Sequence, residues 1–123
     1  MPLSCYEVDN LRRCKVGQSK SYLYIDDCVS GILKASSSGN KTDIFNIGSE
    51  DQVSVNDIAQ LVASALGCDP VFSYKASIRD GRGWLGDVKE MLLDVSKLKS
   101  IGWKPSYTGK EAISLTAFGL SKK

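Results

Sequence analysis

The C-terminal half of the chain contains the stretch Gly81-Arg82-Gly83-Trp84-Leu85-Gly86-Asp87-Val88, then Met91-Leu92-Leu93-Asp94-Val95-Ser96-Lys97-Leu98, then Ile101-Gly102-Trp103-Lys104-Pro105. This order predicts a glycine-rich loop, a short strand over residues 90–93, and a short helix that Asp94 caps and Gly102 ends. The loop over residues 75–88 is long for a compact domain, and long ordered loops often carry function. We therefore expect binding residues in it.

Upstream of this stretch, apolar β-forming runs predict three further strands, over residues 22–25, 44–48 and 71–74. The strand at 22–25 is followed by a helix in which Asp26 or Asp27 is the expected cap and Val29, Ile32 and Leu33 form one buried face. Strand, helix and strand in that order suggest a βαβ unit.

Capping patterns predict the remaining helices. Ser54 with Asp57 starts a helix that Gly67 ends, and Thr108 starts the last helix with Glu111 as its capping partner. A weak first helix is predicted from Ser4 to near residue 13. The sequence thus predicts one α/β domain over residues 1–123, with a small mixed sheet of about four short strands and four or five helices.

Composition narrows the function classes. The balance of 16 basic and 14 acidic residues gives a net charge of +2, which does not favour nucleic acid as a partner. No long apolar run indicates a membrane segment, so we expect a soluble, cytoplasmic protein. The absence of histidine removes any Ser-His or Cys-His catalytic pair.

The four cysteines, Cys5, Cys14, Cys28 and Cys68, form no Cys-x-x-Cys pair, so the sequence predicts no metal site. Two disulfides are an alternative. Reduced thiols are the favoured interpretation, because Cys28 and Cys68 fall within apolar helical patterns.

The letters Gly81-x-Gly83-x-x-Gly86 match the dinucleotide-binding fingerprint, but their context does not. That fingerprint needs a strand that leads through the glycine turn directly into a helix, whereas a strand is predicted to follow here. We therefore predict no cofactor-binding residue in this loop.

The stretch 81–105 resembles the C-terminal region of the extended short-chain dehydrogenase/reductases, the NAD-dependent epimerase/dehydratase family. A second segment, Gly17-Gln18-Ser19-Lys20-Ser21-Tyr22-Leu23-Tyr24-Ile25-Asp26-Asp27, resembles the family segment in which a basic residue precedes an aromatic strand and an acidic pair. The resemblance implies that the chain is the C-terminal, substrate-binding portion of a Rossmann-type enzyme that holds a UDP- or dTDP-sugar.

The resemblance also implies roles for three residues. Arg82 would pair with the diphosphate, which suits a planar fork of donors, and Asp87 would accept from the ribose hydroxyls. Lys20, where many members have Arg, would act on phosphate as a point charge. A solvated surface turn with a stray ion pair is the alternative interpretation of Arg82 and Asp87, and a solvent-facing side chain that of Lys20.

The family's chemistry is not matched in this sequence. Neither the N-terminal glycine-rich turn nor the Tyr-x-x-x-Lys pair is present, since Tyr107-x-x-Lys110 is one residue too short. We therefore predict no catalytic residue, no cofactor bound by this chain alone, and NAD only in an intact enzyme with a complementary N-terminal half.

Two other interpretations remain open. One is a non-catalytic module that binds another protein chain or forms a homo-oligomer through exposed apolar faces. The other is a redox or metal protein. Asp26 and Asp27 are expected to support a helix start rather than catalysis, and Trp103 is expected to pack.

Overall fold

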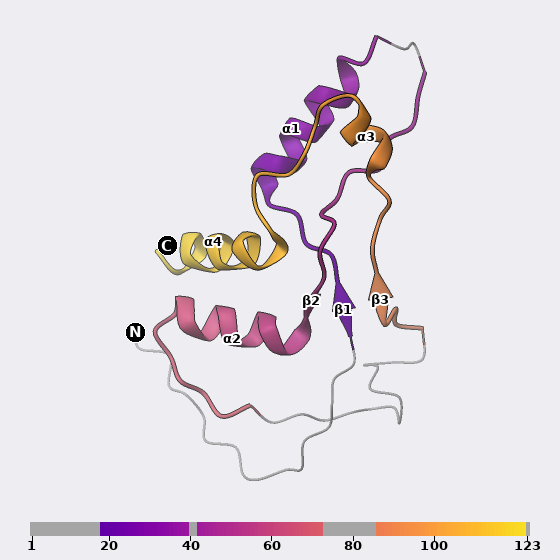
Figure 1. The fold of residues 1–123 in the computed structure, drawn as a ribbon. Coiled ribbons are helices and arrows are strands. Elements are labelled where there is room, and N and C mark those ends of the chain that lie inside the picture. Colours follow the sequence, from indigo (N-terminus) through magenta and orange to yellow (C-terminus); the bar gives the residue numbers. More distant parts are fainter. Residues whose placement is uncertain (1–17, 40–41, 73–85, 123) are drawn as a thin grey trace.

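The computed structural model describes residues 18–39, 42–72 and 86–122 of the chain. Within these ranges the helices are α1 (Ile25–Ser36), α2 (Val55–Ala65), α3 (Ser96–Ser100) and α4 (Gly109–Ser121), and the strands are β1 (Ser19–Lys20), β2 (Val53–Ser54) and β3 (Glu90–Met91). The strands form one mixed sheet of order β2-β1-β3, antiparallel between β1 and β2 and parallel between β1 and β3. Figure 1 shows α1 near α3 at one end, and α2 beside α4 at the other.

Local capping chemistry sets both ends of α2, as predicted. The Ser54 hydroxyl accepts from the Asp57 N–H at 3.1 Å. At the other end Gly67 adopts a φ of +67°, and the Cys68 N–H donates to the Ala63 carbonyl at 2.9 Å. This is the left-handed C-terminal turn in which glycine is favoured because it has no Cβ.

The last two predicted helices are also confirmed. α4 starts with a complete capping box between Thr108 and Glu111. The N-cap of α3 is Val95 and not the predicted Asp94, although the Ser96 N–H donates to the Asp94 carboxylate at 2.9 Å. Gly102 ends the turn with a φ of +90°.

The contact between α2 and α4 depends on small residues. Ala63 and Ala112 are buried, and so is Gly109 at the start of α4. A Cβ at Gly109 would lie 2.9 Å from Cγ2 of Val53, closer than such atoms pack. The absence of a side chain there lets α4 approach β2.

Trp103 is the centre of the packing at the other end. It is 6% exposed, and its indole N–H donates to the Ser30 hydroxyl at 2.9 Å. A Cβ at Gly31 would lie 3.3 Å from the indole ring, so α1 lies close against it. The predicted packing role of Trp103 is confirmed.

Three of the predicted strands are wrong in detail. Residues 22–24 have no regular structure and Ile25 already belongs to α1, while residues 44–48 and the described residues 71 and 72 form no strand. The sheet instead contains β1, which precedes the apolar run at residues 22–25, and β2, which follows the run at residues 44–48. Because β1 and β2 are antiparallel, they do not form the predicted βαβ unit.

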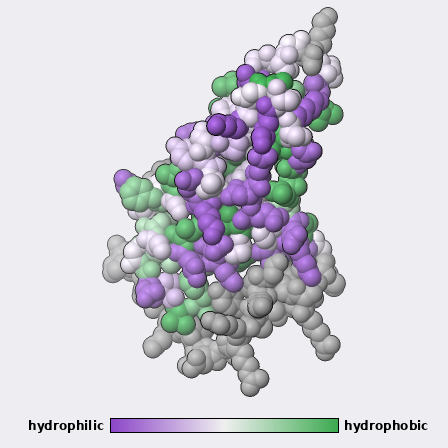
Figure 2. All heavy atoms as spheres, viewed as in Figure 1, coloured by the Kyte–Doolittle hydropathy of each residue, from purple (hydrophilic) through white to green (hydrophobic). Residues whose placement is uncertain are grey.

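The apolar face of α1 also differs from the prediction. Val29, Ile32 and Leu33 are 48%, 53% and 64% exposed, whereas Asp27 and Gly31 are the buried residues of this helix. Figure 2 shows apolar side chains at the surface in this part of the molecule. Among the described residues, therefore, nothing covers the face that the helical pattern marks as apolar.

Other predictions lie outside the described residues. These are the first helix and Cys5 and Cys14, the end of the third strand, and the loop through Leu85. Cys28 has a free thiol, and the Cys68 thiol donates to the Leu66 carbonyl at 3.7 Å. None of the helices in the described ranges is long and apolar enough to cross a membrane, and the predicted cytoplasmic location stays a prediction.

Candidate functional site

The parallel pairing of β1 with β3 brings together residues far apart in the sequence. Ser19 is opposite Glu90, and the Ser19 N–H donates to the Lys89 carbonyl at 2.8 Å. Two residues further along both strands, the Ser21 N–H donates to the Met91 carbonyl at 3.1 Å. This register places Gln18 and Lys20, at either side of Ser19, beside Asp87 just before β3.

Asp87 is the centre of a small polar cluster with Gln18 and Lys20. The Lys20 ammonium lies 3.3 Å from Oδ1 of Asp87, and the Gln18 side-chain amide donates to Oδ2. The side chains of Lys20 and Asp87 are 34% and 20% exposed, so the pair is partly screened by solvent. The cluster is therefore charged and partly accessible to solvent and to a ligand.

The pKa of the Asp87 carboxyl is lowered, first by the Gln18 amide and then by Lys20. Partial burial opposes this shift. Donors that face a carboxylate favour its charged form. Asp87 is therefore held as an anion with acceptor capacity at neutral pH.

The structure thus brings two of the three predicted site residues, Lys20 and Asp87, into contact. Arg82 lies outside the described residues. Sequence reasoning missed Gln18. The available signal was spacing, because alternate positions of a strand share a face, and Gln18 is two residues before Lys20.

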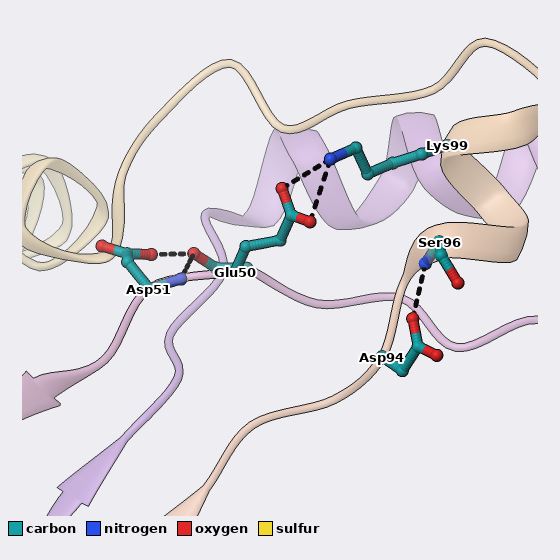
Figure 3. A network of polar contacts seen from close by, with 6 residues as sticks. Glu50, Asp51, Asp94, Ser96 and Lys99 are labelled. Atoms are coloured by element: carbon teal, nitrogen blue, oxygen red, sulfur yellow. Dashed lines mark hydrogen bonds and ion pairs between the residues drawn. The ribbon is translucent and has the colours of Figure 1, made fainter.

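A second polar network supports the fold (Figure 3). Lys99 contacts both carboxylate oxygens of Glu50 at 2.9 Å, and Asp51 accepts from the Ser49 hydroxyl. Oδ2 of Asp51 also accepts from the N–H of Gly109 at 2.8 Å. These contacts attach the segment before β2 to α3 and to the start of α4, a structural use that the sequence did not indicate.

A pocket of about 560 Å³ lies between α2, α4 and the segment after β1. Its lining is mostly apolar and does not include Gln18, Lys20 or Asp87. The lining residues are Tyr22, Leu23, Val62, Leu66, Ala112, Ile113, Thr116, Ala117, Leu120 and Ser121. Within the described ranges, no group of three His, Cys, Asp or Glu side chains has the arrangement of a metal site.

Known proteins are similar to this chain in sequence and in fold. The chain is 31% identical over 96 residues to the putative UDP-glucose 4-epimerase of Methanocaldococcus jannaschii, an alignment that covers 78% of this chain and 29% of that protein. It is 29% identical over 109 residues to the GDP-mannose 3,5-epimerase of Arabidopsis thaliana, covering 86% and 26%. No family model matches the chain.

Two solved structures have the same arrangement of elements. A UDP-galactose 4-epimerase matches with a TM-score of 0.71 and 40% identity over 85% of this chain and 34% of that one. The UDP-glucose 4-epimerase of Thermotoga maritima, solved with UDP-glucose, matches with a TM-score of 0.71 and 30% identity over 89% and 33%. This chain therefore spans about a third or less of the length of the proteins it matches.

Proposed function

Because this chain is homologous to part of the NAD-dependent epimerase/dehydratase proteins, we propose that it binds the nucleotide part of a nucleoside-diphosphate sugar. The contact between Lys20 and Asp87, 67 residues apart in the sequence, is the observation that carries this proposal. A cation beside a partly exposed carboxylate offers one partner for phosphate and one for sugar hydroxyls. The matched structure that was solved with UDP-glucose supports this class of ligand.

Each side chain has a defined part in the proposal. Lys20 uses one of its three ammonium donors on Asp87, which leaves donors for a phosphate oxygen. Asp87 accepts from ribose hydroxyls, and Arg82 adds a bidentate contact to the diphosphate. The sugar is selected by residues beyond these three.

The described residues do not fit a nicotinamide dinucleotide. Such a cofactor needs a glycine turn between a strand and a helix N-terminus, and here α1 follows Tyr24 and α2 follows Ser54. We therefore assign no part in hydride transfer to these residues. We propose that the chain contributes binding, with NAD and the acid/base residues supplied by the remainder of an epimerase or dehydratase architecture.

Calorimetric titration with UDP and with UDP-glucose tests this function. We expect both to bind, and Lys20→Ala to weaken binding about tenfold, as the loss of a charged hydrogen bond does. Lys104→Ala is the matched control, since Lys104 is an exposed lysine outside the cluster. If the wild-type chain binds neither ligand at millimolar concentration, the proposal is wrong.

A second candidate function has an observation in its favour. The exposed apolar face of α1 is what a module that binds another protein chain would present. The homology offers another reason for this exposure. The matched proteins are about three times as long, and in them the remaining two thirds of the chain can pack against the corresponding face. We therefore place nucleotide-sugar binding first.

A further inference from the structure

The apolar pocket between α2 and α4 takes no part in the proposed nucleotide site. The two helices begin side by side, since Gly109 at the start of α4 lies against Val53 just before α2. They run in the same direction away from β2 (Figure 1). Towards their C-terminal ends, Leu66 and Leu120 line the pocket and are 43% and 64% exposed. The described residues thus leave apolar side chains of this pocket open to solvent.

The chemistry of the pocket selects an apolar occupant. No charged side chain lines it. Two of its hydroxyls are already used within α4, because Thr116 donates to the Ala112 carbonyl at 2.8 Å and Ser121 to the Phe118 carbonyl at 2.9 Å. A charged group would lose its hydration here and gain no partner. The volume of about 560 Å³ is large enough for several apolar side chains.

The N-terminal segment, residues 1–17, joins the rest of the chain close to this pocket. The segment lies outside the described residues, which begin at Gln18. The Gln18 carbonyl accepts from the N–H of Val55, the first residue of α2, at 3.2 Å. Tyr22 and Leu23, only four and five residues after Gln18, already line the pocket. The segment therefore connects to the described structure beside the start of α2 and within a few residues of the pocket.

The segment has the length and the composition to cover the pocket. α2 has 11 residues, which is a length of about 16 Å. An extended chain spans that distance with about five residues, and the segment has three times as many. Its large apolar side chains include Leu3, Tyr6, Val8 and Leu11. They are the kind of group that the lining accepts.

We infer that the N-terminal segment covers the pocket between α2 and α4, with the apolar side chains of residues 3–11 against Leu66 and Leu120. This role is independent of nucleotide binding and goes beyond the proposed function. The contact closes a second small core and keeps other apolar molecules out of it. Because the segment continues into β1, its docking also fixes the strand that carries Lys20.

Cysteine cross-linking tests this contact, because the segment contains two native thiols, Cys5 and Cys14. Thr116→Cys and Leu120→Cys each place a thiol in the pocket lining, one turn apart on α4. We expect mild oxidation to join the segment to at least one of them within the same chain, since a disulfide needs Cα atoms within about 7 Å. Leu115→Cys is the matched control, at an exposed leucine of α4 outside the lining. Its yield, mapped by mass spectrometry, should be about tenfold lower, because only a docked segment raises the local thiol concentration.

The opposite results are equally clear. Equal yields at the pocket positions and at Leu115→Cys, or no disulfide from the segment to either pocket position, would overturn the inference. A disulfide that joins two chains would assign the pocket to a second copy and would also contradict it.

Titration with Nile red, a neutral apolar dye, separates a covered pocket from an open one. The double variant Leu3→Asp and Leu11→Asp makes the segment unsuited to an apolar lining, so we expect it to bind the dye about tenfold more tightly than the wild type does. If both proteins bind the dye equally and Leu120→Glu abolishes binding in both, the pocket is open to small molecules and the segment is not its cover.

Discussion

Asp27 shows how one carboxylate can serve a different purpose from the one that its position suggests. The sequence places it at a helix start, where Asp commonly caps. In the structure it lies in the first turn of α1, is 3% exposed, and accepts from the N–H groups of Ser106 at 2.9 Å and Tyr107 at 3.1 Å. It therefore holds the segment before α4 against α1, and the predicted cap at Asp27 is wrong.

Replacement of Asp27 should lower the stability of the fold, because the N–H groups of Ser106 and Tyr107 would lose their hydrogen-bond acceptor. Asp27→Asn places an amide donor against two N–H donors, and we expect a loss of about 2 kcal/mol in the free energy of unfolding. Urea unfolding followed by circular dichroism measures it. Asp26→Asn is the control, since Asp26 is the exposed neighbour in the same turn and should change stability by less than about 0.5 kcal/mol. Equal effects of the two variants would contradict the bridging role.

At the scale of the element, the start of α4 links stability to pH. The Thr108 N–H donates to the Glu111 carboxylate at 2.8 Å, and the Thr108 N–H and hydroxyl lower the pKa of Glu111. A carboxyl whose pKa is lower in the folded state stabilises the fold above its unfolded value of about 4.3. That stabilisation is lost as the pH falls through the folded pKa.

We therefore expect Glu111→Gln to flatten the acid side of the stability profile. The difference in urea midpoint between pH 6 and pH 3 should be smaller in this variant than in the wild type. Among the described residues, Asp57, Asp87 and Asp94 also have a lowered pKa and contribute to the acid dependence that remains. Thr108→Ala should cost about 1 kcal/mol at pH 6, as loss of an N-cap does. An unchanged acid dependence in Glu111→Gln would show that the carboxylate does not stabilise the helix start.

Helix ends were predictable from the sequence because their chemistry is local. Ser54, Thr108 and Gly67 act on backbone groups within a turn of themselves, and the structure confirms all three. Strands were not. The apolar run at residues 44–48 predicts extended, partly buried backbone, but a ladder also needs a partner strand in register, which lies far away in the sequence.

The same distinction applies to the candidate site. The chemistry of Lys20 and Asp87 could be recognised in the sequence by family resemblance. Their contact depends on the register between β1 and β3, which could not be predicted from the sequence. Gln18 was missed because a glutamine has no charge to mark it. Periodicity likewise identified the apolar side of α1 but not whether anything covers it.

At the scale of the whole molecule, the exposed face of α1 should promote association of the isolated chain. The double variant Ile32→Gln and Leu33→Gln should reduce self-association in sedimentation equilibrium, because both side chains are more than half exposed. It should change the free energy of unfolding by less than about 1 kcal/mol, since little buried area is lost. Leu115→Gln, on α4, removes apolar surface elsewhere and should leave association unchanged.

The sensitivity of this association to nucleotide separates the two candidate functions. Association that UDP does not alter, in a chain that shows no binding of UDP by calorimetry, would favour the protein-binding module. A monomeric wild-type chain at high micromolar concentration would contradict the role of the α1 face in either case.

The cluster around Asp87 draws its members from segments 67 residues apart, so it exists only when β1 and β3 are paired. Any molecule that binds there consequently binds the native state and not the unfolded ensemble. Thermodynamic linkage then turns occupancy into thermal protection, worth about 2.7 kcal/mol at a concentration one hundred times the dissociation constant. A scan of nucleotides by melting temperature would thus rank the ligands of this chain without any catalytic assay.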